Sequence, residues 1–255
     1  SAMRSSAITI LFIARAVLSA PPAASAATCY VNKANAACSN SGPGTLATPY
    51  CTISAALTAH HTAGTTIVVL PGIYREQVSL PGSGASGNPI VIQAQGSPGN
   101  PVVVSGAEDF ANPALWVHLS GNVWQAASVT WSPRQVFADS VRLTASAAAP
   151  ASLPVNSFVW VSGQGLYVNV GGDNPGSHHA EVGRQAYGFS VSGRSWVTID
   201  GFTVSRTEDT GIRLANLSNN ITVSHNVATF SFDYGIQAAN CTAILIDSNS
   251  SSDHF

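Results

Sequence analysis

The fold is decided by three short stretches: Val197-Thr198-Ile199-Asp200, Ile221-Thr222-Val223-Ser224 and Ile244-Leu245-Ile246-Asp247. In each, β-branched residues recur at every second position, which is typical of a strand with one buried face. The steps from Ile199 to Val223 and from Val223 to Ile246 are 24 and 23 residues. A fixed period of this length indicates a solenoid, in which each unit buries its apolar face only against its neighbours.

Turn residues repeat with the same period. The units open at Tyr187-Gly188-Phe189, Thr210-Gly211-Ile212 and Tyr234-Gly235-Ile236. Asn226 and Asn249 occupy equivalent positions, where Phe202 stands in the first unit. Stacked asparagines can form an amide ladder that satisfies buried polar groups between units. Short β-branched strands broken by Gly and Asn therefore predict a parallel β-helix and not helical repeats.

The rhythm begins earlier in the chain. Thr65–Leu70 and Pro89–Ile92 place Ile67 and Ile90 23 residues apart. Before them, Thr52–Ala59 has the apolar spacing and leading Thr of a short capped helix. We expect that helix to cover the open first coil, because the exposed end of a solenoid needs a cap.

The period breaks over residues 107–186. This stretch holds four of the five tryptophans and predicts an inserted set of antiparallel strands. The tryptophans form either a second sugar-stacking surface or, more commonly, the core of the insert. The predicted division is a cap at 27–64, first coils at 65–106, the insertion at 107–186 and further coils at 187–255. The last coil ends without a capping element, which predicts that the chain is the N-terminal part of a longer protein.

The composition fits such a protein. Hydrophobic residues make up 45% of the 255 residues and charged residues only 9%, with a formal net charge of −2. A balance this close to neutral excludes a basic surface for nucleic acid. The high apolar fraction also excludes a disordered chain.

The first 26 residues are predicted to be a secretory signal peptide. Met3-Arg4 begins a basic region, an apolar run follows over Ile8–Leu18, and Ala24-Ser25-Ala26 fits the cleavage pattern. A membrane anchor is the weaker interpretation, because the run is short and contains Arg15. We therefore expect a secreted protein with no membrane contact after cleavage.

Export favours disulfides. The mature cysteines are Cys29, Cys38, Cys51 and Cys241. We prefer the pair Cys38–Cys51, which would close a Gly/Pro loop, and Cys29 is the competing partner. Cys241 is expected to be a buried free thiol.

Several stretches carry a family resemblance: Tyr30-Val31-Asn32, Cys38 to Thr45, Pro49 to Ile53 and Val69 to Glu76. They resemble the opening of secreted right-handed parallel β-helix proteins of the pectate-lyase-like superfamily, close to polysaccharide lyase family 9. The resemblance covers nearly the whole mature chain and implies an all-β, right-handed parallel β-helix. It also implies a polysaccharide partner, uronate-containing, that lies in a groove along the helix side.

In family 9 lyases, aspartates bind Ca²⁺, which neutralises a uronate carboxylate, and a lysine removes the C5 proton. The single lysine of this chain, Lys33, precedes the first coil. The lysine base therefore has no place on the repeats. Either the base lies beyond Phe255, or an arginine substitutes for it, or lyase activity is absent.

Aligned repeats nominate the metal ligands. Asp209 and Asp233 both lie two residues before a unit-opening glycine, so they should stack one coil apart, roughly 4.8 Å. Carboxylates this close repel unless a cation or a proton intervenes, and calcium takes such oxygen ligands. Glu208 is adjacent. The interpretation that we favour over a metal site is a pair of solvated turn aspartates.

The catalytic candidates are two arginines and two histidines. Arg206 or Arg213 would clamp a uronate carboxylate better than it would act as a base. His225 and His254 are candidates for general acid or base near neutral pH, although a surface histidine without chemistry is the default. Candidate substrate-binding residues gather on the same turn side: Arg206, Phe230, Phe232 and Tyr234. The competing interpretation is that these aromatics pack inside the coils.

Three function hypotheses follow. The first is a secreted polysaccharide-active enzyme that uses calcium-assisted β-elimination. The second is a non-catalytic glycan-binding or cell-surface protein. The third is a glycosidase or uronan C5-epimerase on the same scaffold, since one fold hosts many activities. We expect a monomer.

Overall fold

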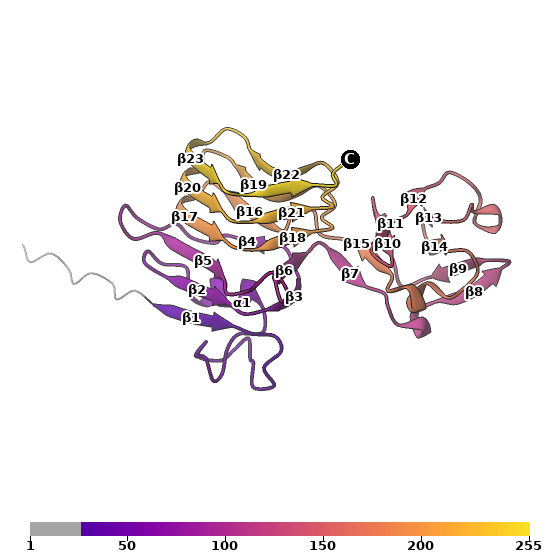
Figure 1. Ribbon diagram of the computed structural model, residues 1–255, viewed down its shortest axis with the longest axis horizontal. Helices are drawn as coiled ribbons and strands as arrows, with labels where there is room; N and C mark the ends of the chain where they lie inside the picture. The colour runs from indigo at the N-terminus through magenta and orange to yellow at the C-terminus, as the bar shows by residue number, and fades with distance from the viewer. Residues whose placement is uncertain (1–26) are drawn as a thin grey trace, which may run out of the picture.

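The computed structural model describes residues 27–255 (Figure 1). The predicted signal peptide, residues 1–26, lies outside the described residues. No helix in residues 27–255 is both long and apolar enough to cross a bilayer.

The alternating β-branched stretches form the strands of three parallel sheets. The first sheet contains β1 (Thr28–Val31), β2 (Thr66–Val69), β5 (Ile90–Ala94), β17 (Ser195–Asp200), β20 (Asn219–Ser224) and β23 (Thr242–Asp247). The second contains β3 (Gly72–Arg75), β6 (Val102–Ser105), β18 (Thr203–Ser205), β21 (Val227–Thr229) and β24 (Ser250–Ser252). The third contains β4 (Val78–Ser79), β16 (Phe189–Ser192), β19 (Thr210–Ala215) and β22 (Tyr234–Ala238).

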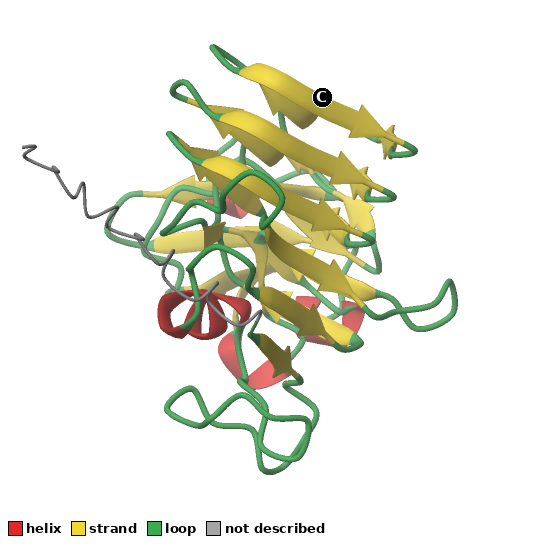
Figure 2. Ribbon diagram, turned by 90° about the vertical axis from the view of Figure 1, so that its left-hand side faces the viewer, coloured by secondary structure: helices red, strands yellow, loops and turns green. Residues whose placement is uncertain are grey.

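The chain visits the three sheets in turn and then returns to the first, and we call one such passage a coil. Figure 2 shows the successive strands of the coils stacked in layers. The register pairs Val197 with Ile221 and Ile221 with Ile244. The predicted period of 24 and 23 residues is therefore the length of one coil, and equivalent residues lie side by side.

The core fills the inside of the coils. Val197, Ile199, Ile221 and Val223 are each at most 1% exposed, and Phe189 packs edge-on against Phe202. Burying an aliphatic side chain of this size stabilises the fold by about 1.5–3 kcal/mol. The residues between them in β17 and β20 point outward, so one face of each strand is accessible to solvent and to a ligand.

The predicted asparagine ladder is confirmed. Asn226 is 1% exposed, accepts a hydrogen bond from the backbone N–H of Phe202, and donates to the carbonyls of Ile199 and Ser224. Its amide also donates to Asn249 Oδ1 at 3.1 Å. The ladder satisfies the backbone where each coil turns from the first sheet to the second.

The N-terminal cap is held by a helix and a disulfide. Helix α1 (Ile53–Ala59) buries Ile53, Ala56 and Leu57, and the Thr52 side chain caps it. The predicted disulfide Cys38–Cys51 is confirmed, with the Cα atoms 5.1 Å apart. Cys29 is a buried free thiol whose pKa is raised to about 11 by that burial.

One cysteine prediction was wrong. Cys241 is free, but it is partly exposed and not buried. Its coil packs on a neighbouring coil from one side only within the described chain, so the side chain is covered less than those of earlier coils.

The insert leaves the coils between β6 and β16 and forms two sheets of mainly antiparallel pairs (Figure 1). The sheet nearer the coils contains β7 (Ala107–Asp109), β10 (Val136–Ala138), β11 (Val141–Arg142) and β15 (Glu181–Gly183). The other contains β8 (Val117–Ser120), β9 (Val123–Ala126), β12 (Thr144–Ala145), β13 (Ser157–Val161) and β14 (Gly165–Asn169). Short 3-10 helices lie at Pro113–Leu115, Pro150–Ser152 and Pro175–His178.

The tryptophans of the insert belong to its core. Trp116, Trp124, Trp131 and Trp160 pack in one apolar cluster, and each donates its indole N–H to a backbone carbonyl. Because ring and N–H are both engaged, the core interpretation holds and not the sugar-stacking one.

We predict that Asn226→Ala lowers the free energy of unfolding by about 2 kcal/mol, because it leaves the buried Phe202 N–H and Ile199 carbonyl without partners. Asn249→Ala is the matched control: Asn249 is only partly buried, so its loss should cost less. Urea denaturation of both variants measures the difference. An unchanged free energy of unfolding in Asn226→Ala would show that the ladder does not stabilise the coils.

Candidate functional site

The predicted carboxylates lie where the chain turns from the second sheet to the third, at residues 206–209 and 230–233. The backbone N–H of Asp233 donates to the carbonyl of Asp209 at 2.8 Å, so the two aspartates are neighbours on successive coils. Their side chains have separate partners. Asp209 accepts from the Thr210 hydroxyl, and Asp233 forms a bidentate pair with Arg134 of the insert at 2.9 and 3.1 Å.

Glu208 anchors the insert to the coils. Its buried carboxylate accepts hydrogen bonds from the backbone N–H groups of Arg134 and Gln135. Burial raises the pKa of Glu208, and those two N–H donors partly offset the rise. Gln135 is itself fully buried, and its amide donates to the carbonyls of Thr207 and Phe230 on two successive coils. These contacts fasten the insert at this corner.

The three predicted metal ligands do not fit a calcium ion in this arrangement. Glu208 is turned to backbone donors and Asp233 to a guanidinium, which leaves few free oxygens for the six to eight that calcium takes. Within the described residues, no three His, Cys, Asp or Glu side chains gather to hold a metal ion. Calcium binding stays a prediction.

The predicted arginines are also occupied. The Arg206 guanidinium pairs with Glu181 of the insert at 3.0 Å, and Arg75 pairs with the same carboxylate at 2.7 Å. Burial lowers the pKa of Arg206, although the charge of Glu181 opposes that shift. Arg213 lies on the third sheet with its guanidinium over the Tyr187 ring, 5.0 Å from the centroid. The structure therefore does not bring the two arginines together around one site.

The aromatics of this corner serve packing. Phe230 meets Phe137 of the insert edge-on at 5.6 Å, and Phe232 lies under the Arg134 guanidinium at 3.6 Å. Tyr234 differs, since it is 55% exposed on the third sheet. Lys33 belongs to the N-terminal cap and donates to the carbonyl of Ile73.

His254 points into the coils. It follows Thr207 and Ser231 in one column, and its Nε2 contacts the Ser251 hydroxyl at 2.7 Å. Its Nδ1 is buried without a hydrogen-bond partner, as are the hydroxyls of Thr207 and Ser231. A side chain in this position is poorly placed to reach a glycan outside the coil.

His225 has the geometry that the other candidates lack. It lies at the corner between the first and second sheets, and its side chain is 64% exposed. Its Nδ1 contacts Asp200 Oδ1 at 2.8 Å, and the Ser224 hydroxyl donates to the same oxygen at 2.7 Å. The hydrogen bond and charge of Asp200 raise the pKa of His225. Nδ1 is thus fixed, while Nε2 has no protein partner among the described residues.

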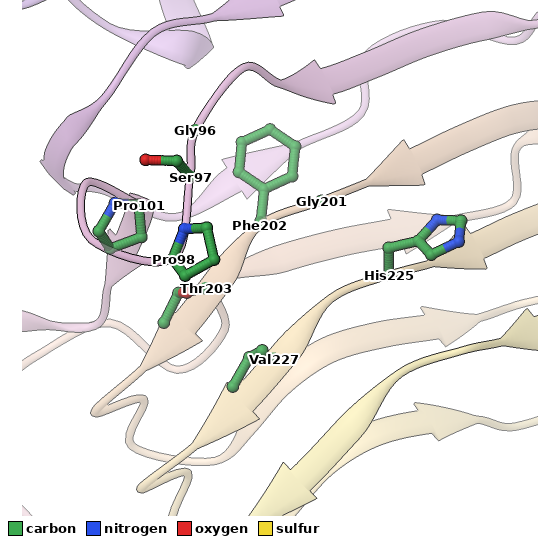
Figure 3. A pocket seen from close by; sticks show the side chains of 9 residues that line it. All are labelled: Gly96, Ser97, Pro98, Pro101, Gly201, Phe202, Thr203, His225 and Val227. Atoms are coloured by element: carbon green, nitrogen blue, oxygen red, sulfur yellow. The ribbon is translucent and has the colours of Figure 1, made fainter.

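A groove of about 380 Å³ lies beside this histidine. Ser97, Pro98 and Pro101 of the β5–β6 loop line it from one side, and Thr203 and Val227 come from the coils. Figure 3 shows His225 at the opposite end of the groove from these prolines. Because its ring points away from the prolines in that view, His225 can exchange a proton with a molecule that extends past the histidine end of the groove.

Sequence reasoning missed both carboxylates of this corner, Asp200 and Asp247. The register aligns Asp200 with Ser224 and Ser224 with Asp247, so the two acids flank one serine across two strand spacings, roughly 10 Å. Asp247 is exposed, and its charge adds to the rise in the pKa of His225. The signal was present in the three repeats, whose last residues read Asp, Ser and Asp.

Comparison with known proteins identifies the fold. No protein-family model matches the chain, and no curated protein matches it in sequence. A solved complex of XylC with xylose matches at a TM-score of 0.64 with 18% identity, covering 83% of this chain and 42% of that one. A structure described as a glycoside hydrolase matches at 0.57 with 11% identity, covering 80% and 64%. At these identities the likeness shows the fold alone, and the chain spans less than two thirds of either protein.

We predict that Gln135→Ala lowers the free energy of unfolding by about 2 kcal/mol, because two carbonyls inside the contact lose their donor. Gln125→Ala is the matched control, since that amide makes one exposed hydrogen bond within the insert. Urea denaturation and limited proteolysis of the insert measure both. Unchanged stability and protease resistance of the Gln135 variant would contradict the fastening role.

Proposed function

We propose that the protein is a secreted, right-handed parallel β-helix protein that hydrolyses a glycosidic bond of a polysaccharide. One observation carries the proposal: Asp200 fixes His225 beside a groove, with Asp247 on the other side of Ser224. The fold supports it, because the similar structures include a glycoside hydrolase and XylC in complex with xylose.

In the proposed mechanism each group has one role. Asp200 holds Nδ1, so Nε2 carries the proton that is given to the glycosidic oxygen as the bond to the anomeric carbon breaks. Water attacks the anomeric carbon, and Asp247 takes the proton of that water. The backbone N–H of His225 donates to the carbonyl of Asp247 at 3.2 Å, so the proposed acid and base lie on adjacent coils.

The charges at this corner favour a neutral glycan. Asp200 and Asp247 flank one histidine, and like charges would repel a uronate carboxylate here. Arg134 and Arg206 are paired with acids at the other corner. Calcium-assisted β-elimination of a uronate-containing polysaccharide therefore stays the alternative that the family resemblance suggests. Unsaturated product from polygalacturonate would identify it.

We predict that His225→Ala and Asp247→Asn each lower kcat at least a hundredfold, because each removes one proton transfer. Release of reducing ends from xylan, arabinan and polygalacturonate measures the rate. His118→Ala is the matched control, because His118 is an exposed histidine of the insert that contacts a backbone carbonyl. Wild-type turnover by the His225 variant would overturn the mechanism, and glycan binding without any cleavage by the wild type would favour the non-catalytic alternative.

We predict that Asp200→Asn moves the alkaline limb of the pH profile to lower pH. The Asp200 charge raises the pKa of His225 above 6.5, so the acid form persists to higher pH in the wild type. Without that charge the imidazolium loses its proton earlier as pH rises. The pH dependence of kcat/KM and NMR titration of His225 measure the shift, and an unmoved limb would show that His225 is not the acid.

A further inference from the structure

The outer face of the first sheet carries a second hollow, of about 330 Å³. It is lined by Trp196 and Thr198 of β17, by Asn220 and Thr222 of β20, and by Pro89 and Leu245. No ionisable side chain lines it. A ring face surrounded by hydroxyls and an amide suits a neutral sugar, whose C–H face stacks on the ring while its hydroxyls take hydrogen bonds.

Trp196 stands apart from the other tryptophans. The four in the insert donate their indole N–H to backbone carbonyls, whereas the Trp196 N–H has no partner within residues 27–255. The ring is partly exposed. Trp196 therefore offers both a face and a free donor to a ligand.

The backbone of Trp196 is also unusual. Its φ is +58°, in the left-handed region that bulky side chains rarely adopt. The equivalent residues of the next two coils, Asn220 and Ala243, have φ of +53° and +52°. The turn is thus shared by three successive coils, and in two of them a smaller residue meets its needs. Placing a tryptophan there costs free energy that packing inside the coil does not return.

We infer that Trp196 is a sugar-stacking platform, and that a neutral oligosaccharide extends along β17 from His225 to this hollow. The inference rests on the proposed function and deepens it. Trp196, Thr198 and Asp200 alternate with buried residues on one strand, so all three face outward. Four residues of strand span about 13 Å, which is longer than one sugar ring. A disaccharide held at His225 leaves the platform empty, and a longer chain covers it.

The test is calorimetric titration with xylobiose and xylohexaose of the wild type, Trp196→Ala and Trp196→Phe, each carrying Asp247→Asn so that the ligand is not cleaved during the measurement. We expect Trp196→Ala to weaken xylohexaose binding about tenfold and to leave xylobiose binding unchanged. Trp196→Phe keeps a ring but no N–H, and should lie between them. Leu217→Ala is the control, since Leu217 is exposed outside both hollows.

The outcomes separate the two proposals. Equal weakening for both ligands, or none for either, overturns the platform. Loss of length dependence in Trp196→Ala together with full turnover by His225→Ala would retain the platform and overturn the hydrolytic mechanism. Failure of the wild type to bind xylohexaose would overturn both for this glycan class. Circular dichroism of each variant shows that the coils are intact.

Discussion

Hydrogen bonding between successive coils is the constraint on which the rest of the structure depends. Because each coil pairs with the next in parallel register, every position is repeated in space at the strand spacing. Apolar positions merge into one continuous core, and polar positions become rows of side chains on the outside. The side chains of a row can hydrogen-bond to one another and to the backbone, as the asparagines do, or they can face solvent. The rows that are left define where a ligand can bind.

The two corners illustrate these alternatives. At the turn from the second sheet to the third, acids and arginines of the coils form ion pairs and hydrogen bonds with the insert. These charged groups already have partners in the contact between coils and insert, so they are not free to bind a ligand. A buried charge needs such a partner. At the turn from the first sheet to the second, the insert makes no such contact, and the Asp200–His225 pair faces a groove.

The sequence was sufficient for the strands, the coil length, the asparagine ladder and the disulfide, because each depends on spacing along the chain. It was insufficient for the candidate site, because the partners of Glu208, Asp233 and Arg206 come from the insert, about 25 to 100 residues away. No periodicity relates the insert to the coils. The sequence therefore predicted Glu208 and Asp233 as metal ligands, although both carboxylates accept hydrogen bonds from the insert, Glu208 from Arg134 and Gln135 and Asp233 from Arg134.

The row that ends the strands of the first sheet could have been recognised beforehand. Asp200, Ser224 and Asp247 each follow an aliphatic residue of the alternating pattern, so their side chains must point outward, and no arginine or lysine occupies the aligned position. In a chain with only 9% charged residues, two aligned acids without a cation leave a negative charge that no aligned residue balances. The side chain of His225 pairs with Asp200 and leaves the Asp247 carboxylate unpaired among the described residues. In the proposed mechanism, that asymmetry leaves His225, held by Asp200, as the proton donor and the free Asp247 as the proton acceptor.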